Sequence, residues 1–182
     1  MLNEQKLIQA QTDFLERHPG GFADPQMLAV AKKHRMDKLV EFATAAFSRE
    51  ACENVEDTAE NAIRLVSRSS MVSRFEKPRF RDFVRRMSAD ERSFLVHALC
   101  QFLHGEQQEG FEALVDLLAT EKLAKWSLVT VIPACYAPQQ EVFVKPTTAK
   151  GVISFFEVLD LVYRPRPSWE FYQAYRSLII DA

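Results

Sequence analysis

The sequence predicts an all-α protein, a single domain built as a compact bundle or an irregular array of about seven to nine helices. Apolar residues recur at helical spacing along most of the chain, and no segment alternates strictly between apolar and polar residues. Five glycines in 182 residues are too few for the many turns of a β protein. The composition, 47% hydrophobic and 26% charged, is typical of one folded domain spanning residues 1–182.

The N-terminal third predicts two or three helices. The first lies within residues 3–17, and its apolar stripe consists of Leu7, Ile8, Phe14 and Leu15. Asp24 then precedes Pro25 as a helix start, because Asp accepts hydrogen bonds from first-turn amides and Pro at the first position loses no needed donor. This second helix runs toward Phe47, with a restart near Asp37.

The middle of the chain predicts two further helices. Residues 55–67 place acidic side chains ahead of apolar ones, an order that suits the helix dipole. Ser88 and Glu91 form a capping box before the apolar run of 94–103, because each side chain can bond the other residue's amide. Gly105 closes that helix.

Two more helices follow, between Gly105 and Pro133. The first carries its apolar positions at helical spacing, at Phe111, Leu114, Val115 and Leu118. The second covers residues 121–132 and is kinked or stopped by Pro133. An extended stretch from Val129 to Ile132 is the alternative.

The C-terminal region predicts two helices with polar caps. Thr147 or Thr148 caps one that runs through Phe156. Ser168 caps the last, from Trp169 to about residue 180, after an extended segment rich in Pro and Arg.

Positive charge is concentrated in residues 61–92, which carry nine basic and four acidic side chains. Eight of the nine are arginine, whose planar guanidinium binds phosphate through two hydrogen bonds and stacks on bases. Phe75, Phe80 and Phe83 lie between them. The alternative is a solvated helix face whose arginines pair with the acidic N-terminal helices, with the phenylalanines in the core. The residues predicted to contact nucleic-acid phosphates are Arg74, Lys77, Arg79, Arg81, Arg85 and Arg86.

A second candidate phosphate site lies at Lys145, Thr147 and Lys150. These side chains flank a predicted helix N-terminus, whose free amides and positive dipole end suit an anion. The glycine pattern of a P-loop is absent, so the alternative is a capping threonine with exposed lysines.

Aromatic and arginine side chains gather in the C-terminal tail, which suggests a surface for a protein partner or a second copy. The predicted partner-binding residues are Tyr163, Arg166, Trp169, Tyr172 and Arg176. On the last helix one row of side chains packs inward and the other lines a groove or an interface, and the spacing does not say which. The two rows are Trp169, Tyr172, Arg176 and Phe171, Tyr175, Leu178.

The tail contains Lys-Pro-Thr at 145–147 and Pro-x-Trp-x-x-Tyr at 167–172. It resembles the tails of uncharacterised bacterial proteins that carry the same turn and the same later motif. The resemblance covers about a quarter of the chain. It implies a bacterial cytoplasmic protein and implies no activity and no catalytic residue.

Three cysteines, Cys52, Cys100 and Cys135, are odd in number and widely spaced among apolar neighbours. This pattern predicts small buried side chains in a reducing compartment rather than a disulfide framework. The N-terminus lacks the apolar core of a signal peptide, and no apolar run approaches about 18 residues. We therefore expect a cytoplasmic protein that does not contact membranes.

No group of residues predicts a metal or a cofactor. His97, Cys100 and His104 lie at i, i+3 and i+7 of one helix, but the two histidines are then about 10.5 Å apart along the axis, too far to share one metal ion. Glu141 and Lys145 have the residue types of a metal-dependent nuclease pair, although their spacing and the absence of a predicted sheet argue against it.

The sequence contains no catalytic signature of the hydrolase, zinc-protease, calcium-loop or dinucleotide-binding kind. We therefore predict a non-catalytic binding module that contacts nucleic-acid phosphates. The alternative is a protein-interaction or scaffolding module that self-associates or binds a protein partner through its C-terminal aromatic helix.

Overall fold

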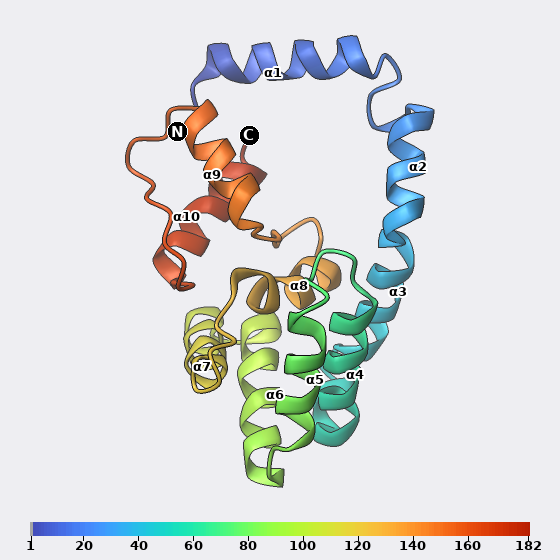
Figure 1. Ribbon diagram of the computed structural model, residues 1–182, viewed down its shortest axis with the longest axis vertical. Helices are drawn as coiled ribbons and strands as arrows, with labels where there is room; N and C mark the ends of the chain where they lie inside the picture. The colour runs from blue at the N-terminus through green and yellow to red at the C-terminus, as the bar shows by residue number, and fades with distance from the viewer. Residues whose placement is uncertain (1) are drawn as a thin grey trace.

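The computed structural model describes residues 2–182, and in this part of the chain it is all-helical, with ten α-helices and no strand (Figure 1). The all-α prediction is thus confirmed. The helices are α1 (Glu4–Arg17), α2 (Pro25–His34), α3 (Met36–Ala46), α4 (Val55–Arg68), α5 (Glu76–Arg85), α6 (Ala89–His104), α7 (Gln107–Ala119), α8 (Trp126–Tyr136), α9 (Pro146–Phe155) and α10 (Trp169–Ile180), with short 3-10 turns η1 (Gly21–Ala23) and η2 (Ala51–Glu53).

Ten helices exceed the seven to nine that we predicted, and two places explain the difference. Arg35 adopts a left-handed conformation (φ 52°) that separates α2 from α3, close to the restart predicted near Asp37. Helix α5 occupies the middle of the basic segment, for which no helix boundaries were predicted. Its Pro78 lies in the first turn, where amides have no intrahelical partner and proline is tolerated.

Helix α8 differs from its prediction at both ends. It begins at Trp126 rather than at residue 121, and it continues through Pro133 to Tyr136, so the alternative of an extended stretch at 129–132 is wrong. Proline removes one backbone hydrogen bond of the helix. Nine of its eleven residues are buried, and this packing holds the helix together across the proline.

Polar caps begin several helices as expected. Asp24 accepts from the amide of Gln26, Ser88 and Glu91 form the capping box, and Ser168 accepts from the amide of Phe171. Helix α9 is an exception, because it begins at Pro146 after Lys145 and has no side-chain cap. The predicted capping role of Thr147 or Thr148 is therefore wrong.

The buried core is formed mainly by α3 to α8 and α10, and Ala149 of α9 also belongs to it. Its largest fully buried side chains are Trp126, Tyr172, Phe47, Phe102 and Phe111. Helices α6 and α7 approach each other closely at Gly110, where a Cβ atom would lie 2.3 Å from the amide nitrogen of Phe102. Gly110 thus lets α7 carry Phe111 into the aromatic centre of the core.

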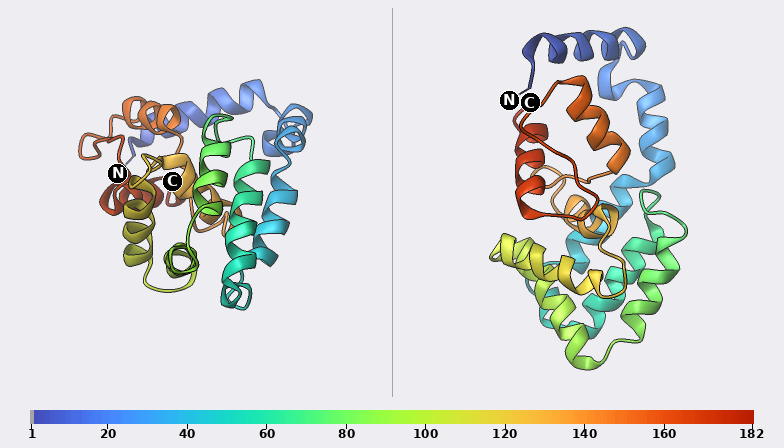
Figure 2. Two further views of the ribbon diagram at one scale, coloured as in Figure 1. Left: turned by 60° about the horizontal axis from the view of Figure 1, so that its bottom comes forward. Right: turned by 60° about the vertical axis from the view of Figure 1, so that its left-hand side comes forward.

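Helices α1 and α2, joined by η1, form an N-terminal arm that crosses one end of the molecule and descends along its side (Figures 1 and 2). Neither helix contains a buried residue. The arm is attached near both of its ends: Lys6 forms a salt bridge with Glu157 at 3.0 Å, and His34 hydrogen-bonds Ser70 at 2.6 Å.

None of the helices within residues 2–182 combines the length and the apolar character that crossing a membrane requires.

Candidate functional site

The basic segment runs from the end of α4 through α5 to the start of α6. Four of its arginines form salt bridges with carboxylates. Three of these carboxylates lie outside the segment, on α4 and on the loop after α7, so the arginines fasten α5 and α6 to their neighbours. The pairs are Arg81 with Asp82 (3.0 Å), Arg85 with Glu60 (2.9 Å), Arg86 with Glu121 (2.7 Å) and Arg92 with Glu56.

The other five cations of the segment have no carboxylate within 4.0 Å among residues 2–182. Arg68 lies over the ring of Phe42 at 5.1 Å, and Arg74 over the ring of Phe75 at 4.9 Å. Both arginines are nevertheless exposed to solvent. The remaining three cations are Arg64, which bonds the Asn61 side chain, Lys77, and Arg79, which bonds the Glu121 carbonyl.

The phenylalanines of the segment have different environments. Phe80 and Phe83 are 3% and 4% exposed and belong to the core, as the structural alternative predicted. Phe75 is 69% exposed, beside Arg74 on the loop between α4 and α5. Only Phe75 of the three is therefore open to an external ligand.

The second candidate phosphate site lies at the start of α9, and its two lysines do not point toward a common position. Lys145, directly before α9, and Thr147, in its first turn, are both exposed. Lys150 lies over the ring of Tyr163 at 4.9 Å, on the side of α9 that faces the C-terminal loop. The first turn of α9 has free amides, as we expected for an anion site. Its two lysines, however, do not gather there, because Lys150 lies against Tyr163.

Glu141 is the centre of a buried polar cluster that ties α10 to the rest of the body. Its carboxylate, 7% exposed, accepts hydrogen bonds from Arg176 at 3.0 Å, from Gln107 at 2.8 Å and from the Tyr172 hydroxyl. The Val142 amide in turn donates to the Tyr172 oxygen. Because these protein groups occupy the carboxylate, Glu141 does not form the nuclease-like pair with the exposed Lys145.

The electrostatics of this cluster favour a neutral Tyr172. Burial first, and then the negative charge of Glu141, raise the pKa of the phenol well above its usual value. Burial also raises the pKa of Tyr175 and of Tyr163. The cluster is therefore a salt bridge with a hydrogen-bonded phenol, an arrangement that positions α10.

Both rows of α10 contribute to the interior. Phe171, Tyr172 and Tyr175 are buried, and Arg176 lies over the rings of Trp169 and Tyr172. Tyr172, predicted to bind a partner, is 0% exposed, so its ring contacts the core in this fold. Trp169 and Tyr163 are half-buried, and Arg166 is exposed in a salt bridge with Asp116.

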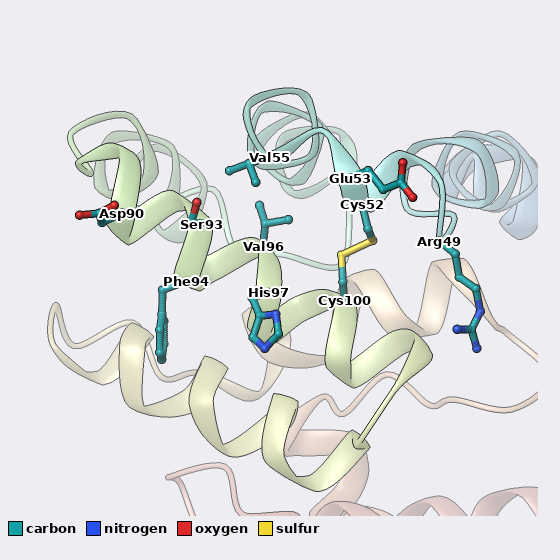
Figure 3. A pocket seen from close by; sticks show the side chains of 10 residues that line it. All are labelled: Arg49, Cys52, Glu53, Val55, Asp90, Ser93, Phe94, Val96, His97 and Cys100. Carbon is teal, nitrogen blue, oxygen red and sulfur yellow. A yellow bond between two sulfur atoms is a disulfide. The ribbon is translucent and has the colours of Figure 1, made fainter.

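Cys52 and Cys100 are joined by a disulfide between η2 and α6, with their Cα atoms 6.3 Å apart (Figure 3). The prediction that all three cysteines are reduced and buried is therefore wrong for two of them. Sequence spacing could not reveal the pair, because 48 residues separate the two cysteines. Cys135 is buried and free, and burial raises its pKa to about 11.

The disulfide lines a shallow pocket of about 670 Å³ whose other walls include Arg49, Phe94 and His97 (Figure 3). His104 hydrogen-bonds the Phe47 carbonyl at 2.7 Å and lines an adjoining pocket together with His97 and the disulfide. Across the described residues, no three His, Cys, Asp or Glu side chains are arranged to hold a metal ion.

Comparison of the chain with protein-family models, with curated proteins and with solved structures finds no match. Its function must therefore be argued from its own residues.

Sequence reasoning did not single out the cations at the bend between α2 and α3. These are Lys32, Lys33, Arg35 and Lys38, which line one pocket together. They fall within the N-terminal third of the sequence, whose net charge is negative, so the total charge of that region conceals them. The spacing of four cations within seven residues could have revealed them.

Proposed function

We propose that this protein is a non-catalytic helical module that binds nucleic acid through its phosphate groups. The observation that carries the proposal is that Arg64, Arg68 and Arg74 are each exposed without a carboxylate within 4.0 Å, and that the exposed ring of Phe75 lies beside Arg74. Guanidinium groups bind phosphate oxygens, and an exposed aromatic ring can stack on an unpaired base. Single-stranded nucleic acid is the form that this combination fits best.

The paired arginines have a different part in this proposal. Arg85 and Arg86 hold Glu60 and Glu121, so their first role is to fix α5 against its neighbours. Both side chains are more than half exposed, and exposed salt bridges are weak enough for a phosphate to compete. In this proposal Arg85 and Arg86 contribute to the affinity for nucleic acid, and the unpaired arginines determine most of it.

Fluorescence anisotropy with labelled single-stranded and duplex DNA and RNA tests the proposal. We expect binding at about 50 mM salt that weakens by orders of magnitude at about 200 mM, because bound phosphates release counterions. The double variant Arg68→Gln/Arg74→Gln should weaken binding strongly. A matched control, Arg17→Gln/Arg164→Gln, removes two exposed arginines elsewhere and should leave it unchanged. No binding at the lower salt, or equal losses in both variants, would contradict the proposal.

The proposed compartment is the cytoplasm, where nucleic acid is available. The Cys52–Cys100 disulfide counts against it, because cytosolic thiols are usually kept reduced. Alkylation of free thiols in freshly lysed cells under denaturing conditions, which also expose the buried Cys135, followed by mass spectrometry, decides the matter. Three alkylated cysteines support the cytoplasm, whereas protected Cys52 and Cys100 favour an oxidising compartment.

A second candidate function, self-association, is favoured by apolar side chains that the fold leaves uncovered. Phe22 on the arm is 79% exposed, and Leu159 after α9 is 92% exposed. Because one chain supplies both, two copies can cover each other's apolar residues around a two-fold axis. Light scattering after gel filtration should then show a dimer that persists at high salt and is lost in Phe22→Ser/Leu159→Ser. A monomer at every concentration would exclude this candidate.

A further inference from the structure

The bend between α2 and α3 forms a pocket of about 810 Å³. Helix α2 ends at His34, Arg35 turns the chain with φ 52° and ψ 36°, and α3 begins at Met36. The turn brings residues from both helices to one concave surface. Leu28 and Ala31 supply apolar walls of this pocket from α2.

Four cationic side chains line the same pocket, and all four are exposed: Lys32, Lys33, Arg35 and Lys38. None of them has a carboxylate within 4.0 Å among the described residues. Asp37 is the one acidic residue in the lining, so the pocket carries a formal net charge of +3. Like charges gathered in a concavity raise the local potential and attract anions.

This arrangement differs from that of the paired arginines of the basic segment. Arg85, Arg86 and Arg92 each reach a carboxylate on a neighbouring element, whereas the cations at the bend reach none. The C-terminus of α2 and the N-terminus of α3 meet at the bend, so their opposite dipole ends offset each other and the side chains set the charge of the pocket. Asp37 offsets one of the four positive charges, and an external anion can neutralise the remaining +3.

We propose that this pocket binds the polyphosphate group of a small phosphorylated compound. A chain of two or three phosphates matches the net charge of +3 and spans more of the pocket than one phosphate can. The Arg35 guanidinium can hold one phosphate through two hydrogen bonds, and the ammonium groups of the three lysines can act as point charges on the adjacent phosphates. Leu28 and Ala31 leave space beside the phosphates for an uncharged portion of the ligand. The inference does not rest on nucleic-acid binding.

Isothermal titration calorimetry of the full chain with sodium tripolyphosphate tests the proposal. We expect one site per chain, and weaker binding of inorganic orthophosphate at equal ionic strength. The double variant Lys33→Gln/Lys38→Gln should lose about tenfold in affinity, because two exposed charge pairs are removed. The matched control Lys122→Gln/Lys125→Gln removes two exposed lysines that form no salt bridge and should bind as the parent chain does.

A second variant separates charge from backbone conformation. Glycine adopts the left-handed conformation of Arg35 without steric cost, so Arg35→Gly should fold normally, with an unchanged melting temperature, and still bind tripolyphosphate more weakly. Undiminished binding by this variant and by the lysine variant, equal loss in the control, or equal binding of orthophosphate would each overturn the proposal. A nucleoside triphosphate titrated in parallel shows whether an attached base adds affinity.

The two proposals can fail separately. Loss of tripolyphosphate binding with intact nucleic-acid binding would overturn the pocket alone. Tripolyphosphate binding by Arg68→Gln/Arg74→Gln at parental affinity would show that the pocket acts independently of the basic segment.

Discussion

Helices α1 and α4 both contain 14 residues and both are amphipathic, yet α4 buries six residues and α1 buries none. The apolar face of α4 is covered by α3, α5 and α6. The apolar stripe of α1 includes Ile8 and Leu15, which are 57% and 45% exposed. The amphipathic pattern therefore predicts the helix in both cases, but only packing partners decide whether that helix contributes to the core.

The charged groups divide along a different line. In the body, Glu141 and Arg176 satisfy each other in the interior, and Arg85 and Arg86 reach carboxylates on neighbouring elements. The cations that end α2 reach none, and neither do the five unpaired cations of the basic segment. Substitutions of the paired groups should accordingly change stability, and substitutions of the unpaired cations should change binding.

The largest effect is expected from the disulfide of the body. Cys52→Ser/Cys100→Ser removes a cross-link between residues 48 apart in sequence, which should lower the free energy of unfolding by about 4 kcal/mol on the chain-entropy model. Urea denaturation without reductant measures the difference. Parent and variant should become similarly stable once a reductant is added, and a parent chain indifferent to reductant would show that the bond is absent in solution.

The buried salt bridge should give the next largest effect. Arg176→Met leaves the carboxylate of Glu141 inside the fold without its cation, and we expect a loss of about 3 kcal/mol. The double variant Glu141→Gln/Arg176→Met should recover part of this loss, because no buried charge remains unpaired. Equal destabilisation of the single and double variants in urea denaturation would show that packing of Arg176, rather than its charge, is what matters.

Tyr172→Phe should cost about 2 kcal/mol at neutral pH, since a hydrogen bond to a charged group is lost. It should also change the alkaline behaviour. The pKa of Tyr172 is raised in the fold, so its contribution is complete below about pH 10 and falls by about 1.4 kcal/mol per pH unit above it, where the unfolded phenol ionises first. Unfolding measured between about pH 8 and 11 should therefore decline less steeply in the variant. Parallel curves would contradict the assigned environment.

Local signals predicted much of this fold. Asp24, Ser88 and Ser168 cap helices because their side chains satisfy amides one turn away, and such contacts can be recognised in the sequence. The start of α8 and its continuation through Pro133 could not be recognised in the sequence, because both depend on the packing around nearly every residue of that helix.

Residues that act across long sequence separations were harder to predict. The partners of Glu141 lie 31 to 35 positions away on one element and 34 away on another, and Cys52 meets Cys100 only after α4 to α6 have packed. The basic segment was recognisable by composition. Which of its arginines pair, and which stay available, depends on the carboxylates of α4 and of the loop after α7.

The smallest effect on stability is expected from the arm. Ile8→Ser/Leu15→Ser changes two exposed apolar residues, and the free energy of unfolding should move by no more than about 0.5 kcal/mol. Leu95→Ala, in the core at 2% exposure, is the matched change in the body and should cost about 2 to 5 kcal/mol. If the serine variant is instead strongly destabilised in a concentration-dependent way, the arm is covered in solution by a second copy, and self-association becomes the better account of its exposed apolar residues.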